Sequence, residues 1–295
     1  MITIKLTGGL GNQMFQYALG RSASQKLQSD FQLDISGYVN QVGVASRQYA
    51  LDIFNIRENF AKDDEISSLV KFFRAYKLGK ILLYVYNYLP LRYRQYVKEP
   101  YYHFFAKIFD ISIDSYLEGY WQSEKYFKDV EDVLRQEFTL KSSMQVTLDT
   151  KFIHQIQSTN SVSVHVRRGD YVTNKSTNQT HGTCSIEYYE KALSKIVETV
   201  SDPHLFIFSD DIEWAQEHLK LDYPVTYVSN GTYTDYEELF FMSLCSHNII
   251  ANSSFSWWGG WLNNNPGKIV IAPKKWFLDP SYDPKDLIPN GWITF

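Results

Sequence analysis

The sequence predicts an α/β protein whose second half is a doubly wound parallel sheet. From residue 161 onward, short apolar runs of strand length alternate with amphipathic stretches of helix length. The chain also opens with an apolar run, a glycine-rich turn and a helical pattern. Polar residues follow several of the apolar runs. This alternation is typical of an open parallel sheet, which binds ligands at the carboxyl ends of its strands.

The first half begins as one βα unit, with a strand over residues 2–6, a turn over 7–13 and a helix over 14–28. Glycines in such a turn let the backbone approach a ligand, and a helix start offers free N–H groups. The spacing G-G-x-G is not the G-x-G-x-x-G of dinucleotide-binding proteins, and a turn that needs positive φ explains the glycines equally well. The turn alone therefore does not identify a ligand.

The rest of the first half is less regular. We predict strands over 31–34 and 116–121 and a helix over 123–138 with Ser123 as its N-cap. No Pro- or Gly-rich linker marks a domain boundary, which we place between residues 140 and 161. The expected organisation is two domains, residues 1–150 and 151–295.

Residues 66–98 contain no acidic side chain, and we expect part of this basic segment to be helical, up to Leu89. Its cations, interleaved with apolar and aromatic residues, are Lys71, Arg74, Lys77, Lys80, Arg92, Arg94 and Lys98. One interpretation is a basic amphipathic helix on an anionic membrane surface. The other is a helix packed on the core with a solvated basic face.

In the second half we predict strands over 161–166, 204–208, 225–228, 248–251 and 269–272, with helices over 185–200, 212–221, 235–246 and 255–262. Residues 172–182 are expected to form a polar loop. The first of these strands ends in Arg167-Arg168-Gly169-Asp170. Arginine suits bidentate phosphate binding, and alternation along a strand points the two arginines to different sides. A surface salt bridge is the simpler explanation for any single Arg-Asp pair.

Two more strands are expected to end at the same edge of the sheet as residues 161–166, and we call this carboxyl edge the rim. One carries Asp210 and Asp211, and the other carries Ser253 and Ser254 before a helix. Hydroxyls beside helix N-terminal N–H groups can bind phosphate, although a simple helix cap uses the same hydrogen bonds. An aspartate could accept from a base or ribose, and Phe255 could stack on a flat ring. Together these residues predict a nucleoside diphosphate site.

The composition and net charge of the chain limit the classes of function to consider. A net charge of -4 gives no case for nucleic-acid binding, and Cys184 and Cys245 form neither a metal motif nor a disulfide framework. The 22 Tyr and 7 Trp suit sugar rings and bases, or a tyrosine-rich core. We find no signal peptide and no membrane-spanning run, so we expect a cytoplasmic protein.

Three motifs in this order resemble the α-1,2-fucosyltransferases of glycosyltransferase family 11. They are G-G-L-G-N-Q-M-F-Q from Gly8, H-V-R-R-G-D-Y from His165 and N-S-S-F-S-W-W-G from Asn252, and together they span nearly the whole chain. The resemblance implies a GT-B-like fold with two Rossmann-type domains facing a cleft. It implies transfer of L-fucose from GDP-β-L-fucose to O2 of a terminal galactose, with inversion and without a metal ion or other cofactor.

The resemblance also implies roles for the residues that match. Arg167 would contact the β-phosphate, while Arg168 would pair with Asp170 or another acid and support the loop. Further donor-binding candidates are Gly9, Gly11, Asn12, Arg168, Asp210, Ser253, Ser254 and Phe255. Residues 1–150 would bind the acceptor and residues 151–295 the GDP-sugar.

The general base stays open between Asp170, which we prefer, His165 and Glu118, and the departing phosphate could itself take the proton. The acceptor is expected to be a galactose-terminated glycan, carried on a lipid during O-antigen or surface glycan synthesis. Such a role fits a cytoplasmic protein in peripheral contact with the inner membrane. The alternatives are another GDP-sugar or linkage, or a glycan- or nucleotide-binding protein without turnover.

Overall fold

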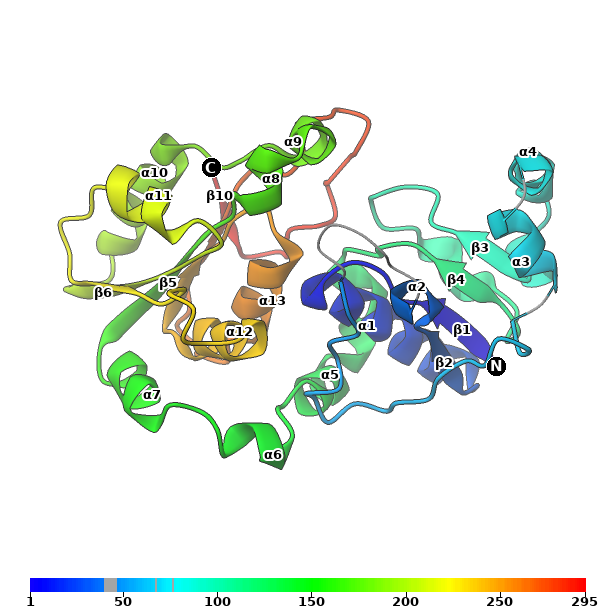
Figure 1. Cartoon of the computed structure of the whole chain (residues 1–295), viewed down its shortest axis with the longest axis horizontal. Coiled ribbons are helices and arrows are strands. Elements are labelled where there is room, and N and C mark those ends of the chain that lie inside the picture. Colours follow the sequence, from blue (N-terminus) through cyan, green and yellow to red (C-terminus); the bar gives the residue numbers. More distant parts are fainter. Residues whose placement is uncertain (40–46, 67, 76) are drawn as a thin grey trace. The chain divides into compact units, whose positions relative to one another are not determined.

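The computed structural model describes residues 1–39, 47–66, 68–75 and 77–295. The chain forms two compact units (Figure 1). Unit 1 comprises Met1–Lys141 with Lys285–Leu287, and unit 2 comprises Ser142–Pro284 with Ile288–Phe295. The chain therefore returns briefly to unit 1 near its end, which no sequence pattern had indicated.

Unit 1 contains a four-stranded parallel sheet with the order β2-β1-β4-β3. Its strands are β1 (Ile2–Lys5), β2 (Phe31–Asp34), β3 (Tyr96–Lys98) and β4 (Tyr116–Glu118). Its α-helices are α1 (Leu10–Leu27), α2 (Ser36–Val39), α3 (Ser68–Ala75), α4 (Lys77–Tyr86) and α5 (Glu131–Glu137). Short 3-10 turns cover Leu91–Tyr93, Ala106–Asp110, Glu124–Tyr126 and Lys128–Val130.

The helix α1 packs tightly on the sheet of unit 1. Gly20 allows this approach, because a Cβ there would come within 2.8 Å of both Ile4 and Phe31. On the other side, α1 contacts Glu137 of α5, whose carboxylate accepts from the Tyr17 hydroxyl and pairs with Arg21. The central position of α1 fixes the glycine turn that precedes it.

Unit 2 contains a six-stranded parallel sheet with the order β10-β9-β8-β5-β6-β7. Its strands are β5 (Asn160–Val166), β6 (Pro203–Ser209), β7 (Val225–Tyr227), β8 (His247–Ile249), β9 (Val270–Ala272) and β10 (Ile293–Thr294). Its helices are α6 (Ser142–Gln145), α7 (Thr150–Gln157), α8 (Gly169–Thr173), α9 (Lys175–His181), α10 (Ile186–Val197), α11 (Ile212–His218), α12 (Asp235–Leu244) and α13 (Ser254–Leu262).

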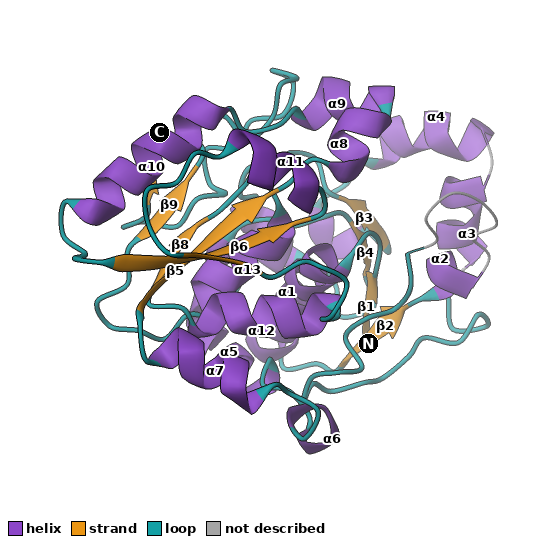
Figure 2. Ribbon diagram, turned by 60° about the vertical axis from the view of Figure 1, so that its left-hand side comes forward, coloured by secondary structure: helices purple, strands orange, loops and turns teal. Residues whose placement is uncertain are grey.

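Both faces of the second sheet are covered by helices (Figure 2). The strand β6 shows why, because successive side chains alternate between faces. Leu205 and Ile207 pack in one cluster with residues of α10 and α11. Phe206 and Phe208 pack in a second cluster with residues of α7 and α12. The predicted doubly wound sheet is therefore confirmed.

Several predicted elements differ from the structure. The segment 123–138 begins with two 3-10 turns and is α-helical only over Glu131–Glu137, and Ser123 caps the first turn. Residues 172–182 are not a loop, because Asn174 accepts from Ser176 and Thr177 and caps α9. The strands β3 and β10 were not predicted: β10 has only two residues, and β3 lies in the less regular first half of the chain. Tyr76 of the basic segment lies outside the described residues.

Candidate active site

The carboxyl end of β5 delivers Arg167 into a cluster of charged side chains. Its Nη2 lies 2.5 Å from Oδ1 of Asp170 and its Nη1 lies 3.0 Å from Oδ2 of Asp210. The guanidinium is largely shielded, with 21% of the side chain exposed, whereas 45% of the Asp170 side chain is exposed. An incoming anion can therefore compete most easily for the Asp170 side of Arg167.

Asp210, at the end of the neighbouring strand β6, holds the loop after β5 in place. Its Oδ1 accepts from the backbone N–H of Arg168 at 2.7 Å. A Cβ at Gly169 would collide with Oδ2 of Asp210, so only glycine permits this approach. Both carboxylate oxygens thus contact the R-R-G-D segment. The predicted contact between Asp210 and the base or ribose of the donor stays a prediction.

Arg168 points to a different set of partners. Its Nε donates to Oδ2 of Asp211 at 3.1 Å, and its guanidinium lies 3.9 Å from the ring centroid of Trp214 in α11. Of the two partners expected for Arg168, Asp170 or another acid, the structure shows another acid, and Asp170 pairs with Arg167. The bond to Asp211 agrees with the broader expectation that Arg168 binds another acid and supports the loop.

The helix α13 begins shortly after β8, and β8 is the strand that pairs with β5 in the sheet. Ser253 is buried and is the N-cap, where its hydroxyl accepts from the N–H of Phe255. Ser254 is half-buried, and the described residues give its hydroxyl no hydrogen-bond partner. The first turn of α13 thus presents a hydroxyl and N–H groups at the same rim as Arg167.

His165 lies beneath this rim. It is buried, and its Nδ1 shares a 2.8 Å hydrogen bond with the Ser256 hydroxyl, while its ring lies 5.8 Å from that of Phe255. Burial, and then the nearby Arg167, lowers the pKa of His165 to about 3. A neutral, enclosed imidazole is suited to linking β5 to α13, and our proposal gives it no proton-transfer role.

Other residues that the sequence did not single out hold the rim together. The Tyr171 hydroxyl donates to the carbonyl of Asn252 at 3.2 Å, and the Tyr171 ring stacks on His181. The Asn252 side chain in turn donates to the carbonyls of His181, Gly182 and Trp276. Asn252 and Tyr171 lie inside the motifs that contain Ser253 and Arg167, and this nearness in sequence could have indicated that they belong to the site.

In unit 1, the glycine turn leads directly into α1, which begins at Leu10 and not at Met14 as predicted. Gly8 has φ +80°, and a Cβ there would meet Nδ2 of Asn12. The side-chain oxygen Oδ1 of Asn12 accepts from Nε2 of Gln122 at 2.8 Å. Gly9 is the N-cap and Gly11 is buried in the first helical turn. The positive φ confirms the structural explanation of Gly8, and ligand contacts by Gly9, Gly11 and Asn12 stay predictions.

Two carboxylates lie at the carboxyl end of the first sheet. Glu118 pairs with Lys5 at 3.0 Å and accepts from the Tyr96 hydroxyl, so its charge is already balanced. Glu99, which the sequence did not indicate, accepts from the N–H groups of Tyr120 and Trp121 at 2.7 and 3.0 Å. Burial raises the pKa of Glu99 to about 7, although these two N–H groups oppose the shift.

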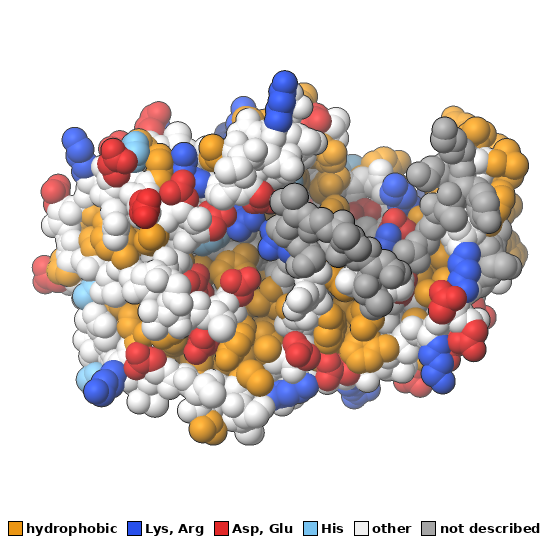
Figure 3. All heavy atoms as spheres, in the orientation of Figure 1, with side chains coloured by type: hydrophobic (Ala, Val, Ile, Leu, Met, Phe, Trp, Pro, Cys, Tyr) orange, Lys and Arg blue, Asp and Glu red, His pale blue; other side chains and the backbone are white. Residues whose placement is uncertain are grey.

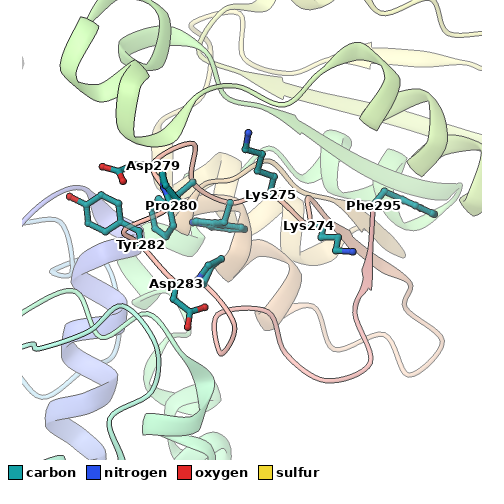
Figure 4. A pocket seen from close by; sticks show the side chains of 10 residues that line it. Lys274, Lys275, Asp279, Pro280, Tyr282, Asp283 and Phe295 are labelled. Atoms are coloured by element: carbon teal, nitrogen blue, oxygen red, sulfur yellow. The ribbon is translucent and has the colours of Figure 1, made fainter.

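A pocket of about 630 Å³ lies beside the rim of unit 2 (Figure 4). It is formed by the segment that follows β9 together with the last residue of the chain. Its lining residues are Lys274, Lys275, Trp276, Phe277, Asp279, Pro280, Tyr282, Asp283, Pro284 and Phe295. The pocket does not include Arg167 or Ser253. It is joined to the rim by the Asn252 bond to the Trp276 carbonyl and by the contact between the His181 and Phe277 rings.

Among the described residues, no group of three His, Cys, Asp or Glu side chains is arranged to hold a metal ion. The cluster around Arg167 instead pairs two guanidinium groups with three carboxylates, those of Asp170, Asp210 and Asp211. Guanidinium groups and a helix N-terminus are the protein groups that neutralise phosphate directly. The chemistry that this rim can perform is therefore binding of a diphosphate and stabilisation of its charge.

Comparison with known proteins agrees with this geometry. The family model of glycosyl transferase family 11 matches residues 1–295. The chain belongs to glycosyl transferase family 11. The family resemblance predicted from the three motifs is thereby confirmed.

Relatives of this family 11 glycosyltransferase match along almost its entire length. An alpha-1,2-colitosyltransferase of Escherichia coli is 34% identical over 300 residues, which cover 99% of this chain and 98% of that protein. The O-antigen biosynthesis glycosyltransferase WbnK of Escherichia coli is 33% identical over 303 residues, covering 98% of each. A mouse galactoside 2-alpha-L-fucosyltransferase is 23% identical over 297 residues, covering 94% of this chain and 72% of that protein.

Solved structures share the fold. NodZ alpha-1,6-fucosyltransferase soaked with GDP-fucose matches with a TM-score of 0.54 at 13% identity, over 88% of this chain and 91% of NodZ. POFUT1 in complex with GDP matches with a TM-score of 0.51 at 14% identity, over 92% of this chain and 97% of POFUT1. An α/β fold with two parallel sheets, similar to these GT-B fucosyltransferases, is therefore confirmed.

Proposed function

We propose that this family 11 glycosyltransferase moves L-fucose from GDP-β-L-fucose to O2 of a terminal β-galactoside, forming Fuc(α1-2)Gal. One observation carries the proposal. Arg167 stands at the end of β5, shielded from solvent and held by two aspartates, beside the Ser253-capped start of α13 on the adjacent strand. This arrangement fixes a guanidinium beside a helix N-terminus, a pair of groups suited to a diphosphate, which a glycan-binding protein without turnover does not need.

The reaction is a displacement at the anomeric carbon of the donor. The acceptor O2 forms a bond to C1 of fucose on the face opposite to GDP, while the C1–O bond breaks and its electron pair stays on the β-phosphate. Negative charge therefore grows on the phosphate in the transition state. Arg167 and the first turn of α13 are placed to stabilise this charge, which is commonly the largest catalytic contribution.

Binding of the donor can also prepare the base. Asp170 is bound to Arg167 and is the more exposed of the two aspartates that pair with it. A β-phosphate that takes over Nη2 of Arg167 releases the Asp170 carboxylate, which then accepts the proton from O2. Arg168 is a positioning residue, held by Asp211 and Trp214. We assign the donor to residues 151–295 and the acceptor to residues 1–150.

The second candidate function is transfer of colitose instead of fucose to the same position. It is favoured by the 34% identity to an alpha-1,2-colitosyltransferase. Colitose is L-fucose without the 3-hydroxyl, so the two donors share the diphosphate that contacts Arg167. The identity to an O-antigen glycosyltransferase supports a role in assembling surface glycans such as O-antigen.

A product assay tests the proposal and separates the donors. The purified protein is incubated with GDP-fucose, GDP-colitose or GDP-mannose and with lactose or N-acetyllactosamine, with and without excess EDTA. We expect a 1→2-linked deoxyhexose on galactose by NMR, fastest from GDP-fucose and unchanged by EDTA. A faster reaction from GDP-colitose selects the second candidate. Tight GDP binding without any product would contradict both and indicate a binding protein.

A further inference from the structure

The helix α4 presents a continuous apolar face to solvent. Leu78, Ile81, Leu82 and Val85 are all exposed, and Ile81 has 68% of its surface accessible. Their spacing of i, i+3, i+4 and i+7 places them on one side of a helix. Figure 3 shows hydrophobic side chains gathered over α4. A soluble surface seldom keeps such a row of aliphatic side chains without a partner.

Aromatic residues extend this face beyond the end of the helix. Tyr84, Tyr88, Leu89 and Tyr93 are exposed, and Tyr88 has 74% of its surface accessible. The Tyr84 and Tyr88 hydroxyls are 3.1 Å apart, with ring centroids separated by 5.6 Å. We define the α4 patch as Leu78, Ile81, Leu82, Tyr84, Val85, Tyr88, Leu89 and Tyr93. Tyrosine rings with a polar tip are suited to the boundary between water and lipid.

The opposite side of α4 is packed onto unit 1. Leu83 and Tyr86 contact the buried cluster that contains Phe73, Tyr96 and Tyr116. The Tyr86 hydroxyl accepts from the N–H of Gln95 at 2.7 Å. At Gly79 the helix approaches α3 so closely that a Cβ would overlap the Phe72 carbonyl. Because one side is fixed in this way, the fold itself directs the α4 patch outward.

The sequence that carries the patch is basic. Residues 66–98 carry seven Lys and Arg and no Asp or Glu, and α4 contributes Lys77 and Lys80 in sequence. Arg92 is exposed, with its guanidinium 5.1 Å from the Tyr93 ring centroid, and Lys98 is also exposed. Lys71, on α3, pairs with Asp63. A partner that covers this patch must therefore be both apolar and anionic.

We propose that the α4 patch docks on the surface of an anionic lipid bilayer, with α4 lying in the plane of the headgroups. At 10 residues, α4 is about 15 Å long, half of the hydrocarbon thickness, so it can lie on a bilayer but cannot cross it. No described helix is long and apolar enough for a span. A second copy of the chain is a poorer partner, because self-pairing of this patch brings two basic segments together.

Docking through α4 serves the proposed function if the acceptor is carried by lipid. The active-site contacts described above lie in other elements, so the inference stands or fails separately from the transferase activity. Lipid binding without transfer would contradict only the proposed function, and transfer without lipid binding would contradict only this inference.

Cosedimentation with vesicles tests the inference. The full chain is mixed with vesicles of phosphatidylcholine alone or with 30% phosphatidylglycerol at roughly 0.05 and 0.5 M NaCl, spanning the range in which salt screens surface charge. We expect binding to the anionic vesicles at low salt and at least about tenfold weaker partitioning at high salt or without phosphatidylglycerol. Failure of the wild-type chain to bind anionic vesicles at low salt would overturn the proposal.

Two matched pairs of substitutions locate the surface. Ile81→Ser with Val85→Ser removes two patch residues, and Ile113→Ser with Val146→Ser removes the same residue types from other exposed positions. We expect the first pair to lower partitioning by roughly tenfold or more and the second to leave it unchanged. Both should keep the wild-type Tm and the activity on a soluble acceptor. Equal binding by the two variants would overturn the proposal, as would a vesicle-free dimer that only the first pair dissociates.

Discussion

The turn after β1 in unit 1 and the turn after β5 in unit 2 occupy the same place in two parallel sheets, but they are built differently. The first consists of glycines and amides, with Gly8 at positive φ and Asn12 bound to Gln122. The second consists of arginines held by aspartates from its own loop and from the next strand. The same βα geometry therefore presents uncharged hydrogen-bonding groups in one unit and guanidinium groups in the other.

In the proposed function, this difference divides the substrates between the two units. A diphosphate needs fixed positive charge, and we assign that role to Arg167 of the β5 turn. A neutral sugar needs amides, backbone groups and aromatic surfaces, and we assign its binding to the β1 turn and its neighbours. Arg47, whose guanidinium approaches Gly9, adds a cation near the β1 turn and is a further candidate for contact with a substrate.

Removal of the Arg167 guanidinium is the strongest test of the charged turn. Arg167→Ala should lower kcat by about 10²–10³, because the developing phosphate charge loses its main stabilising group. Arg167→Lys should also be strongly impaired, since lysine cannot bind a phosphate in the bidentate mode. Steady-state kinetics with GDP-fucose and lactose measure both variants.

The control for this prediction is Arg57→Lys, an exposed arginine in unit 1. It should retain wild-type kcat, and all variants should keep the wild-type circular dichroism spectrum. An Arg167→Lys enzyme with near-normal kcat would show that the β5 turn does not act through bidentate phosphate binding.

The buried carboxyl of unit 1 makes stability depend on pH. Because burial raises the pKa of Glu99 from 4.5 to about 7, the folded chain binds this proton more tightly than the unfolded chain. The protonated Glu99 carboxyl therefore contributes fully to the free energy of unfolding below pH 4.5. This contribution is lost as the pH rises through 7, for a change of about 3 kcal/mol. Glu99→Gln should remove most of this loss in urea unfolding curves measured from pH 4.5 to 8.

Two other glutamates serve as comparisons for the pH dependence of unfolding. Burial also raises the pKa of Glu238 in unit 2 to about 7, so part of the pH dependence should survive in the Glu99→Gln variant. Glu190→Gln, at an exposed helix position, should reproduce the wild-type dependence. An unchanged pH profile for Glu99→Gln would contradict the assignment.

The glycine turn can be tested by comparing two glycines at positive φ. Alanine at Gly8 (φ +80°) and at Gly231 (φ +85°) should each cost about 1–2 kcal/mol, but only at Gly8 does the new Cβ meet Asn12. Gly8→Ala should therefore lower Tm further than Gly231→Ala and also weaken acceptor binding, seen as a raised KM. Equal Tm values and an unchanged KM would remove the β1 turn from the proposed acceptor side.

The smallest effect is expected at Arg168, which positions the loop and in our account does not contact phosphate. Arg168→Lys keeps the charge but loses the fixed orientation between Asp211 and Trp214, so we expect a loss of roughly three- to tenfold in kcat/KM. Arg168→Ala should lose more, with part of the activity regained in the lysine variant. Equal losses for Arg168→Lys and Arg167→Lys would contradict the separate roles.

The regular parts of the molecule could be predicted from sequence. In unit 2, long alternating strands such as β5 and β6 carry a clear period, and their polar ends indicated the rim. The short strands β3 and β10 could not be predicted, because tertiary contacts and not local pattern define them. The return of Lys285–Leu287 to unit 1 depends on Asp286, which pairs with Lys125 and accepts from the N–H of Phe104.

The candidate site was predictable in composition but not in pairing. The predicted strand ends brought Arg167, Arg168, Asp170 and Asp210 to one rim, yet sequence spacing could not decide which acid binds which arginine. That choice depends on side-chain reach across the sheet edge, which places Asp211 and Trp214 beside Arg168. Glu99 could not be found, because its burial arises from a turn that is distant in sequence.

Isothermal titration of GDP, GMP and guanosine into the wild-type chain and Arg167→Lys tests the central claim most directly. If Arg167 binds the β-phosphate, the substitution should weaken GDP binding by roughly tenfold or more, a loss typical of one charge-assisted contact. The affinities for GMP and guanosine should change little. An equal loss for all three ligands, or no loss for GDP, would contradict the assignment of Arg167 to the diphosphate.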